Sequence, residues 1–185
     1  MSTSRRSLDG ALDQARAGSD QGFDELFRAT GPAVAGYLRA RGVGDPEGVA
    51  NDVFVRAFRT LHTFQGDGAR FRSWLFSIAH NAAIDESRRR RRRVVEVSLA
   101  AAADPAGGDV EVDVVARLAH ERVHTLLALL SPEQRDVLLL RVVADLSVEE
   151  TAAVVGKGYE AVKALQRRGL AALRRALSSE EGVPQ

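Results

Sequence analysis

The sequence contains no cysteine among its 185 residues. This absence excludes disulfide bonds, zinc–cysteine sites and cysteine nucleophiles. No apolar run approaches the roughly 18 residues that a membrane-spanning helix needs, and the polar residues 1–10 lack the apolar core of a signal peptide. We therefore expect a cytoplasmic protein with no membrane span.

The charges are segregated along the chain, although the formal net charge is only +1. Six consecutive arginines occupy positions 88–93, whereas residues 94–116 hold five acidic and no basic residues. Residues 156–177 carry six basic residues against the single acid Glu160. Two basic zones on either side of an acidic bridge indicate polyanion contacts at two separate places.

Helical periodicity dominates the sequence, and no alternating strand with hairpin punctuation stands out, so we predict an all-α fold. An apolar stripe begins near Phe23 and continues beyond an interruption at Gly31-Pro32. Residues 46–62 and about 71–92 predict two further amphipathic helices. The segment 94–116 is rich in alanine, glycine and acids and has few large apolar residues, which predicts a flexible linker.

The second half contains start and stop signals for several more helices. Ser131-Pro132 is typical of a helix N-terminus, Ser147 and Glu150 have the spacing of a capping box, and Gly156 suits a helix end. A short helix, a glycine turn and a basic helix over residues 147–175 predict a helix-turn-helix. Such a motif places basic side chains of its second helix near a DNA groove. A helical hairpin with a solvated basic face is the other interpretation of this pattern taken alone.

The arginine run, taken alone, is typical of a solvated helix end. Its context favours single-stranded nucleic acid, because aromatic residues and arginines lie beside a glycine-rich loop at residues 65–70. Unstacked bases gain about 1–3 kcal/mol each on an aromatic platform. Phe71 and Trp74 could equally belong to the core.

Two motifs resemble one known family. FRSWLFSIAHNAAID at residues 71–85, followed by arginines, is similar to region 2 of the extracytoplasmic-function (ECF) sigma factors of bacterial RNA polymerase. LSPEQRDVL at 130–138, LSVEETA at 146–152 and AVKALQRR at 161–168 resemble region 4 of the same group.

The resemblance implies two small helical domains and a division of the chain. Residues 1–22 form an N-terminal extension, 23–93 a region 2-like domain, 94–116 the linker, 117–177 a region 4-like domain and 178–185 a tail. It also implies a non-enzymatic initiation factor that lends promoter recognition and DNA melting to core RNA polymerase. The expected partners are the beta-prime clamp, the beta flap, promoter DNA and a separate anti-sigma factor.

The resemblance also assigns site residues. The polymerase-binding surface comprises Asp52, Val55, Arg56 and Arg59. The minus-10 surface comprises Gln65, Asp67, Arg70, Phe71, Ser73, Trp74, Ser77, His80, Asn81, Arg88 and Arg89. The minus-35 surface comprises Lys157, Tyr159, Glu160, Lys163, Ala164, Arg167 and Arg168.

Other functions explain less of the sequence. A stand-alone helix-turn-helix repressor or activator explains only the second half and predicts a dimer on a palindrome. An enzyme needs convergent carboxylates or histidines, and only His120 and His124 share a helix face, without a carboxylate motif. A scaffold that binds only protein leaves both basic zones unexplained. We expect no catalytic residue, metal, cofactor or small-molecule substrate.

Overall fold

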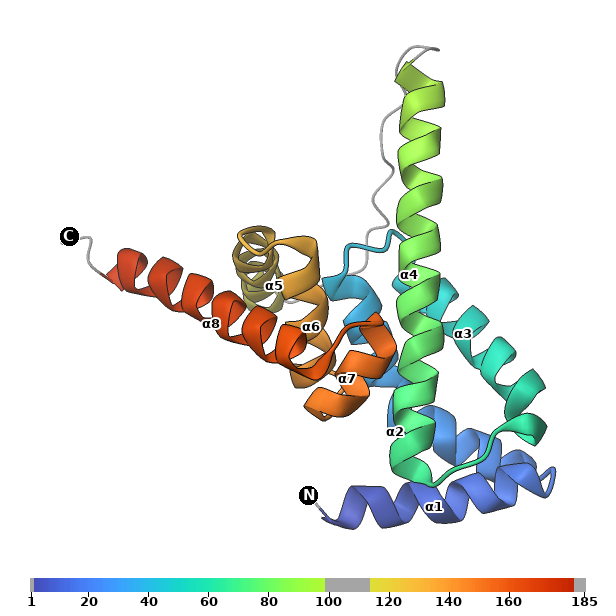
Figure 1. The fold of residues 1–185 in the computed structure, drawn as a ribbon. Helices are drawn as coiled ribbons and strands as arrows, with labels where there is room; N and C mark the ends of the chain where they lie inside the picture. The colour runs from blue at the N-terminus through green and yellow to red at the C-terminus, as the bar shows by residue number, and fades with distance from the viewer. Residues whose placement is uncertain (1, 99–113, 182–185) are drawn as a thin grey trace.

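The computed structural model describes residues 2–98 and 114–181, and within them every regular element is a helix (Figure 1). The elements are α1 (Ser2–Arg16), α2 (Asp20–Ala40), α3 (Pro46–Thr60), the 3₁₀ turn η1 (Leu61–Thr63), α4 (Gly68–Ser98), α5 (Val114–Ala128), α6 (Pro132–Val142), α7 (Val148–Val155) and α8 (Tyr159–Glu181). The all-α prediction is confirmed.

Helix α1 was not predicted, because the sequence analysis treated residues 1–22 only as an extension. Its buried side chains, Leu8, Ala11, Leu12 and Ala15, recur at helical spacing and pack against α2 and α4. This apolar stripe was the available signal. The first half of the chain is therefore a four-helix arrangement that includes the N-terminus.

Helix α2 runs through Gly31-Pro32, where the sequence suggested an interruption. Proline inside a helix costs about 3 kcal/mol, because it removes one backbone hydrogen bond and crowds the preceding turn. Leu26, Val34 and Leu38 are buried on one face on both sides of the proline. Burial of this continuous face outweighs the cost, since each large apolar side chain contributes about 1.5–3 kcal/mol.

The predicted helix 46–62 is confirmed as α3 and η1. Asp45 caps α3 by accepting a hydrogen bond from the amide of Gly48, and Pro46 occupies its first turn. Helix α4 extends to Ser98, and α5 begins at Val114. The predicted linker 94–116 therefore starts and ends in helices, and its middle, residues 99–113, lies outside the described residues.

The caps of the second half are those that the sequence predicts. The hydroxyl of Ser147 accepts from the Glu150 amide at 3.1 Å, while the Glu150 carboxylate accepts from the Ser147 amide at 2.6 Å. Ser131 and Gln134 form a second capping box at the start of α6. Gly156 ends α7 in the left-handed conformation, with φ of +64°.

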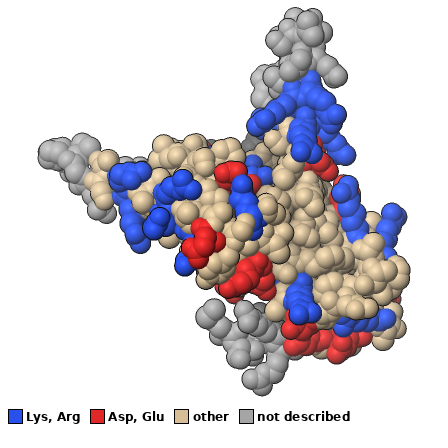
Figure 2. All heavy atoms as spheres, viewed as in Figure 1, with Lys and Arg blue, Asp and Glu red and all other residues tan. Residues whose placement is uncertain are grey.

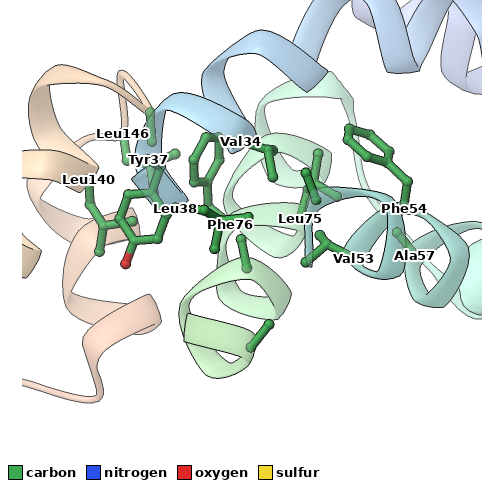
Figure 3. Packing of buried hydrophobic residues seen from close by; sticks show 14 of the residues in the cluster. Val34, Tyr37, Leu38, Val53, Phe54, Ala57, Leu75, Phe76, Leu140 and Leu146 are labelled. Atoms are coloured by element: carbon green, nitrogen blue, oxygen red, sulfur yellow. The ribbon is translucent and has the colours of Figure 1, made fainter. Parts of the chain in front are cut away.

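The two halves share one hydrophobic cluster. Helix α7 packs on α4, while α5 and α6 contact α2. Tyr37 of α2 lies beside Leu140 of α6 and Leu146, and all three are almost completely buried (Figure 3). The C-terminal part of α4, which carries the arginine run, projects away from this cluster (Figure 1). In this closed arrangement the second half covers part of α4.

Candidate nucleic-acid and polymerase interfaces

The exposed face of α3 carries the four residues predicted to bind polymerase. Asp52, Val55, Arg56 and Arg59 are all exposed, and Val55 retains 48% of its surface as an apolar side chain in solvent. Val53, Phe54 and Ala57 lie on the opposite, buried face. Because packing fixes the helix rotation, the structure brings the four residues together on one accessible surface.

The loop between η1 and α4 and the first turn of α4 present three predicted minus-10 residues to solvent: Gln65 and Asp67 in the loop and Arg70 in the helix. Asp67 also caps α4, since its carboxylate accepts from the amide of Arg70 at 2.8 Å. Below the loop, the rings of Phe64 and Trp74 stack with centroids 4.9 Å apart. The stacked rings of Phe64 and Trp74 therefore pack together beside the loop.

Helical spacing aligns several of the predicted residues along α4. Positions 70, 74, 77, 81 and 88 differ by three, four or seven residues and so lie on one face, with Ser73 at its edge. Arg70, Asn81 and Arg88 on this face are exposed, and Trp74 and Ser77 are half-buried. The hydroxyls of Ser73 and Ser77 donate to the backbone carbonyls of Arg70 and Trp74. We name this row, with Ser73, the α4 stripe.

Arg89 does not lie on the α4 stripe. It lines a small cleft between α3 and α4 together with Asp52, Arg56 and Glu86. Its guanidinium lies 3.8 Å from the Glu86 carboxylate. The structure therefore places Arg89 beside the residues predicted to bind polymerase rather than beside those predicted to bind the minus-10 element.

Two further residues predicted at the minus-10 surface are buried. Phe71 has no exposed surface and packs against Phe64 and Trp74. His80 is 6% exposed, and its Nδ1 lies 2.8 Å from the hydroxyl of Tyr37. In this arrangement neither side chain is available to DNA. Phe71 instead packs against Phe64, the residue at the start of the loop. His80 instead lies at the junction between the halves, beside Tyr37.

Burial controls the protonation of this junction. Burial, and to a smaller extent the nearby charge of Arg41, lowers the pKa of His80 to about 4. Burial also raises the pKa of the Tyr37 hydroxyl. Both groups are therefore neutral at pH 7, so that the buried hydrogen bond joins two uncharged side chains.

Polar contacts join the halves around the same place. Arg41, which follows α2, pairs with Asp136 of α6. The Nε of Arg72 on α4 donates to the carbonyl of Ala144 at 2.6 Å. Arg72, Phe76 and His80 recur every four residues and so lie on one row of α4, next to the α4 stripe. The second half contacts this row at Arg72, while Phe76 and His80 pack against Tyr37 of α2.

The helix-turn-helix prediction is confirmed in its packing. Val162 and Leu165 of α8 are buried, and Gly169 is buried against Leu138 of α6. A Cβ on Gly169 would lie 2.8 Å from Leu138 Cδ1, which explains why a small residue stands in mid-helix. The opposite side of α8 therefore faces outward.

That outward side carries the predicted minus-35 residues. Tyr159, Glu160, Lys163, Arg167 and Arg168 are exposed, Ala164 is half-buried, and Lys157 pairs with Glu133 at 2.7 Å. The ammonium of Lys163 lies 5.2 Å above the Tyr159 ring. Figure 2 shows basic side chains along α8 and at the projecting end of α4.

The structure adds residues that the sequence analysis missed. A hollow of about 490 Å³ is lined by Tyr159, Glu160, Lys163, Ala164 and Arg167, and also by Arg141, Gln166 and Arg174. Arg141 comes from α6, so spacing within the second helix could not find it. Arg174 extends the basic row of α8 and was visible in the sequence as part of its charge imbalance.

Within the described ranges, no group of three or more potential ligands could hold a metal ion. No helix among these residues is long and apolar enough to cross a membrane.

Comparison with known proteins gives matches in the same order along the chain. The family sigma-70 region 2 matches residues 26–93, and sigma-70 region 4 matches residues 120–173. The ECF RNA polymerase sigma factor SigD of Mycobacterium tuberculosis is 32% identical over 90% of this chain and 82% of its own length. The ECF RNA polymerase sigma factor BldN of Streptomyces coelicolor is 31% identical over 91% of this chain, which covers 65% of BldN.

A solved structure matches both halves together. CnrH, an RNA polymerase sigma factor of Cupriavidus metallidurans, has been solved in complex with the cytosolic domain of CnrY. It superposes with a TM-score of 0.70 at 30% identity, covering 93% of this chain and 98% of CnrH. The closed arrangement of the two halves is thus similar to that of CnrH in this complex.

Proposed function

The chain belongs to the ECF group of bacterial RNA polymerase sigma factors, and we propose that its two halves divide promoter recognition between them. As a sigma factor it binds core RNA polymerase and directs promoter recognition, DNA melting and initiation. The observation that carries this function is the match of regions 2 and 4, in order, along one chain.

Residues 23–93 act on polymerase and the minus-10 element in this proposal. The exposed face of α3, with Asp52, Val55, Arg56 and Arg59, binds the beta-prime clamp. The loop at residues 65–70 receives a flipped base, and the α4 stripe follows the single strand. Extruding a base costs a few kcal/mol, so selective capture supports both melting and specificity. The accessibility of these residues supports the assignment.

Residues 117–177 read the minus-35 element. The outward side of α8 enters the DNA groove, and the half also meets the beta flap. The support is the basic hollow on α8, with Arg141 and Arg174 placed to reach phosphates at its edges. The site therefore combines groups suited to bases with groups suited to the backbone.

An anti-sigma factor holds the chain in its closed arrangement. Helix α7 packs on α4 and limits access to one side of it, and His80 of α4 is buried beside Tyr37 of α2. The similarity to CnrH bound to a cytosolic partner domain supports capture of this form. Opening of the two halves then precedes initiation. We place this function in the cytoplasm, with no catalytic activity of its own, because polymerase performs the chemistry.

Run-off transcription tests the proposal. Core polymerase transcribes genomic fragments with and without the full chain, and new start sites are mapped. Discrete new starts with shared minus-35 and minus-10 sequences are expected. No new start, together with tight binding of the chain alone to a palindromic duplex, would favour a stand-alone repressor instead.

A further inference from the structure

The loop that is proposed to read the minus-10 base is tied to α1, an element outside both family matches. Arg16, the last residue of α1, donates from Nη2 to the carbonyl of Gly66 at 2.8 Å and to that of Phe64 at 3.2 Å. Its guanidinium also lies 5.5 Å from the centre of the Phe64 ring. The Arg16 side chain thus makes hydrogen bonds to two loop carbonyls and a cation–π contact with the ring of Phe64.

A second residue of α1 holds the other end of the loop. The carboxylate of Asp9 accepts a hydrogen bond of 2.6 Å from the amide of Gly68, the first residue of α4. A carboxylate at a helix N-terminus satisfies a free amide and interacts favourably with the helix dipole. Asp9 and Arg16 therefore hold the two ends of the loop by hydrogen bonds. Asp9 and Gly68 are 59 residues apart in sequence, and Arg16 and Gly66 are 50 residues apart.

The close approach of α1 depends on the absence of a side chain at position 68. A Cβ on Gly68 would lie 2.7 Å from the Cβ of Leu8 and 3.2 Å from the amide nitrogen of Asp9. Leu8 and Leu12 are buried, so α1 cannot move away without exposing its apolar face. The contacts with Asp9 and Arg16 are therefore fixed by packing.

These contacts use the backbone of the loop and do not involve the side chains that are proposed to read the base. Gln65 and Asp67 are exposed on either side of the carbonyl of Gly66 that Arg16 binds. Ordering such a loop only when a base arrives would cost conformational entropy, at about 1–2 kcal/mol per residue fixed. A loop held in place beforehand discriminates between bases more sharply, because a wrong base cannot be accommodated by rearrangement.

We propose that Arg16 and Asp9 are positioning residues for base selection at the minus-10 element, acting through the backbone of residues 64–68. This inference rests on the proposed function of that loop. Neither residue touches DNA in this account. Their loss lowers discrimination at the base read by the loop rather than binding to promoter DNA in general.

The test uses the full chain with core polymerase on a mapped promoter and on templates that each carry one changed minus-10 base. Gln65→Ala first identifies the position that the loop reads, as the position whose preference it weakens. Arg16→Ala is then expected to lower discrimination at that same position by about tenfold, the scale of one lost charge-assisted hydrogen bond. Arg16→Lys, which keeps a donor, restores part of it.

Controls separate positioning from damage to the fold. Arg28→Ala removes a more exposed arginine that pairs with Asp24 on α2, and it should leave every template ratio unchanged. Asp9→Ala is an independent variant that should affect the same position as Arg16→Ala. In the Gln65→Ala background, Arg16→Ala should add little, because both act on one step.

The outcomes distinguish failure of the proposed function from failure of the positioning role of Arg16 and Asp9. Failure of the unaltered chain to initiate on any template would overturn the proposed function itself. If the unaltered chain initiates selectively but Arg16→Ala and Asp9→Ala keep its base preferences, the positioning inference is wrong. A loss that is equal at every minus-10 position would also overturn it, because that pattern reports general unfolding.

Discussion

Arg41 and Asp136 form a buried ion pair that joins the two halves of the molecule, although 95 residues separate them in sequence. Their side chains keep only 12% and 15% of their surface exposed. Burial raises the pKa of Asp136 despite the opposing charge of Arg41. Loss of either partner would therefore destabilise the fold, because the remaining charge would be buried without compensation.

Replacement of Asp136 by alanine should open the two halves. Removal of one partner of a buried pair costs on the order of 3–5 kcal/mol, and opening lets Arg41 return to water. Small-angle X-ray scattering should show a larger radius of gyration for the variant. Asp24→Ala breaks an exposed pair with Arg28 and serves as the control. An Asp136→Ala protein as compact as the parent would show that the ion pair does not hold the closure.

Acid should weaken the fold through His80. Its pKa is lowered to about 4 by burial, whereas an unfolded histidine titrates near pH 6.5. The folded chain therefore binds fewer protons, so the stabilisation is present above about pH 6.5 and is lost as the pH falls toward 4. Between pH 6.5 and 5 the loss amounts to about 2 kcal/mol.

Melting temperatures between pH 7 and 5 measure this effect. His80→Gln keeps a hydrogen-bond partner for Tyr37 but does not titrate, so its melting temperature should fall less than that of the parent. Asp136, whose raised pKa acts in the opposite direction, is present in both proteins and does not affect the comparison. His62→Gln, at an exposed position, is the matched control. Parallel curves for parent and His80→Gln would refute the assignment.

Gly22 should resist replacement by alanine. A Cβ at this position would lie 2.4 Å from the amide nitrogen of Ala15 and 2.8 Å from the carbonyl carbon of Gln14, which are backbone atoms. We expect Gly22→Ala to destabilise the fold by about 1–3 kcal/mol through overpacking. In α1, by contrast, a Cβ on Gly10 would meet no atom within 4 Å. Gly10→Ala should therefore stabilise the chain by up to about 1 kcal/mol, as urea unfolding can measure; equal effects for both variants would contradict the packing of α1.

Arg174 should contribute to phosphate binding at the minus-35 element. It lines the basic hollow, whereas its exposed neighbour Arg175 does not. Arg174→Ala should weaken holoenzyme binding to all minus-35 duplexes alike and reduce the salt slope by about 1. Arg175→Ala should have a smaller effect on both. A sequence-dependent loss in Arg174→Ala would instead assign this residue to base reading.

Local signals predicted the helices well, because caps and apolar stripes act within one or two turns. Ser147 with Glu150 and the glycine at position 156 behave as their spacing suggests. The expected helix interruption at Pro32 is wrong, because the local cost of the proline is outweighed by tertiary burial of Leu26, Val34 and Leu38. The predicted interface residues of α3 share a face for the same reason of periodicity.

Contacts between distant segments could not be predicted in this way. Burial of Phe71 and His80, and the position of Arg89 beside α3, depend on how α4 packs against α1, α2, α3 and α7. The hydrogen bond from Arg16 to the carbonyl of Gly66 joins residues that are 50 positions apart, and no local sequence pattern predicts it. These long-range contacts distinguish the supporting residues from those that are predicted to bind DNA.

Charge reversal on α3 tests whether this face binds polymerase. Run-off transcription from a promoter mapped with the unaltered chain is repeated with the Arg56→Glu/Arg59→Glu double variant, in which both changed residues are exposed. We expect the discrete start to disappear while the melting temperature and the binding to minus-35 duplex are retained. Undiminished initiation by the folded double variant would contradict the assignment of this face to polymerase.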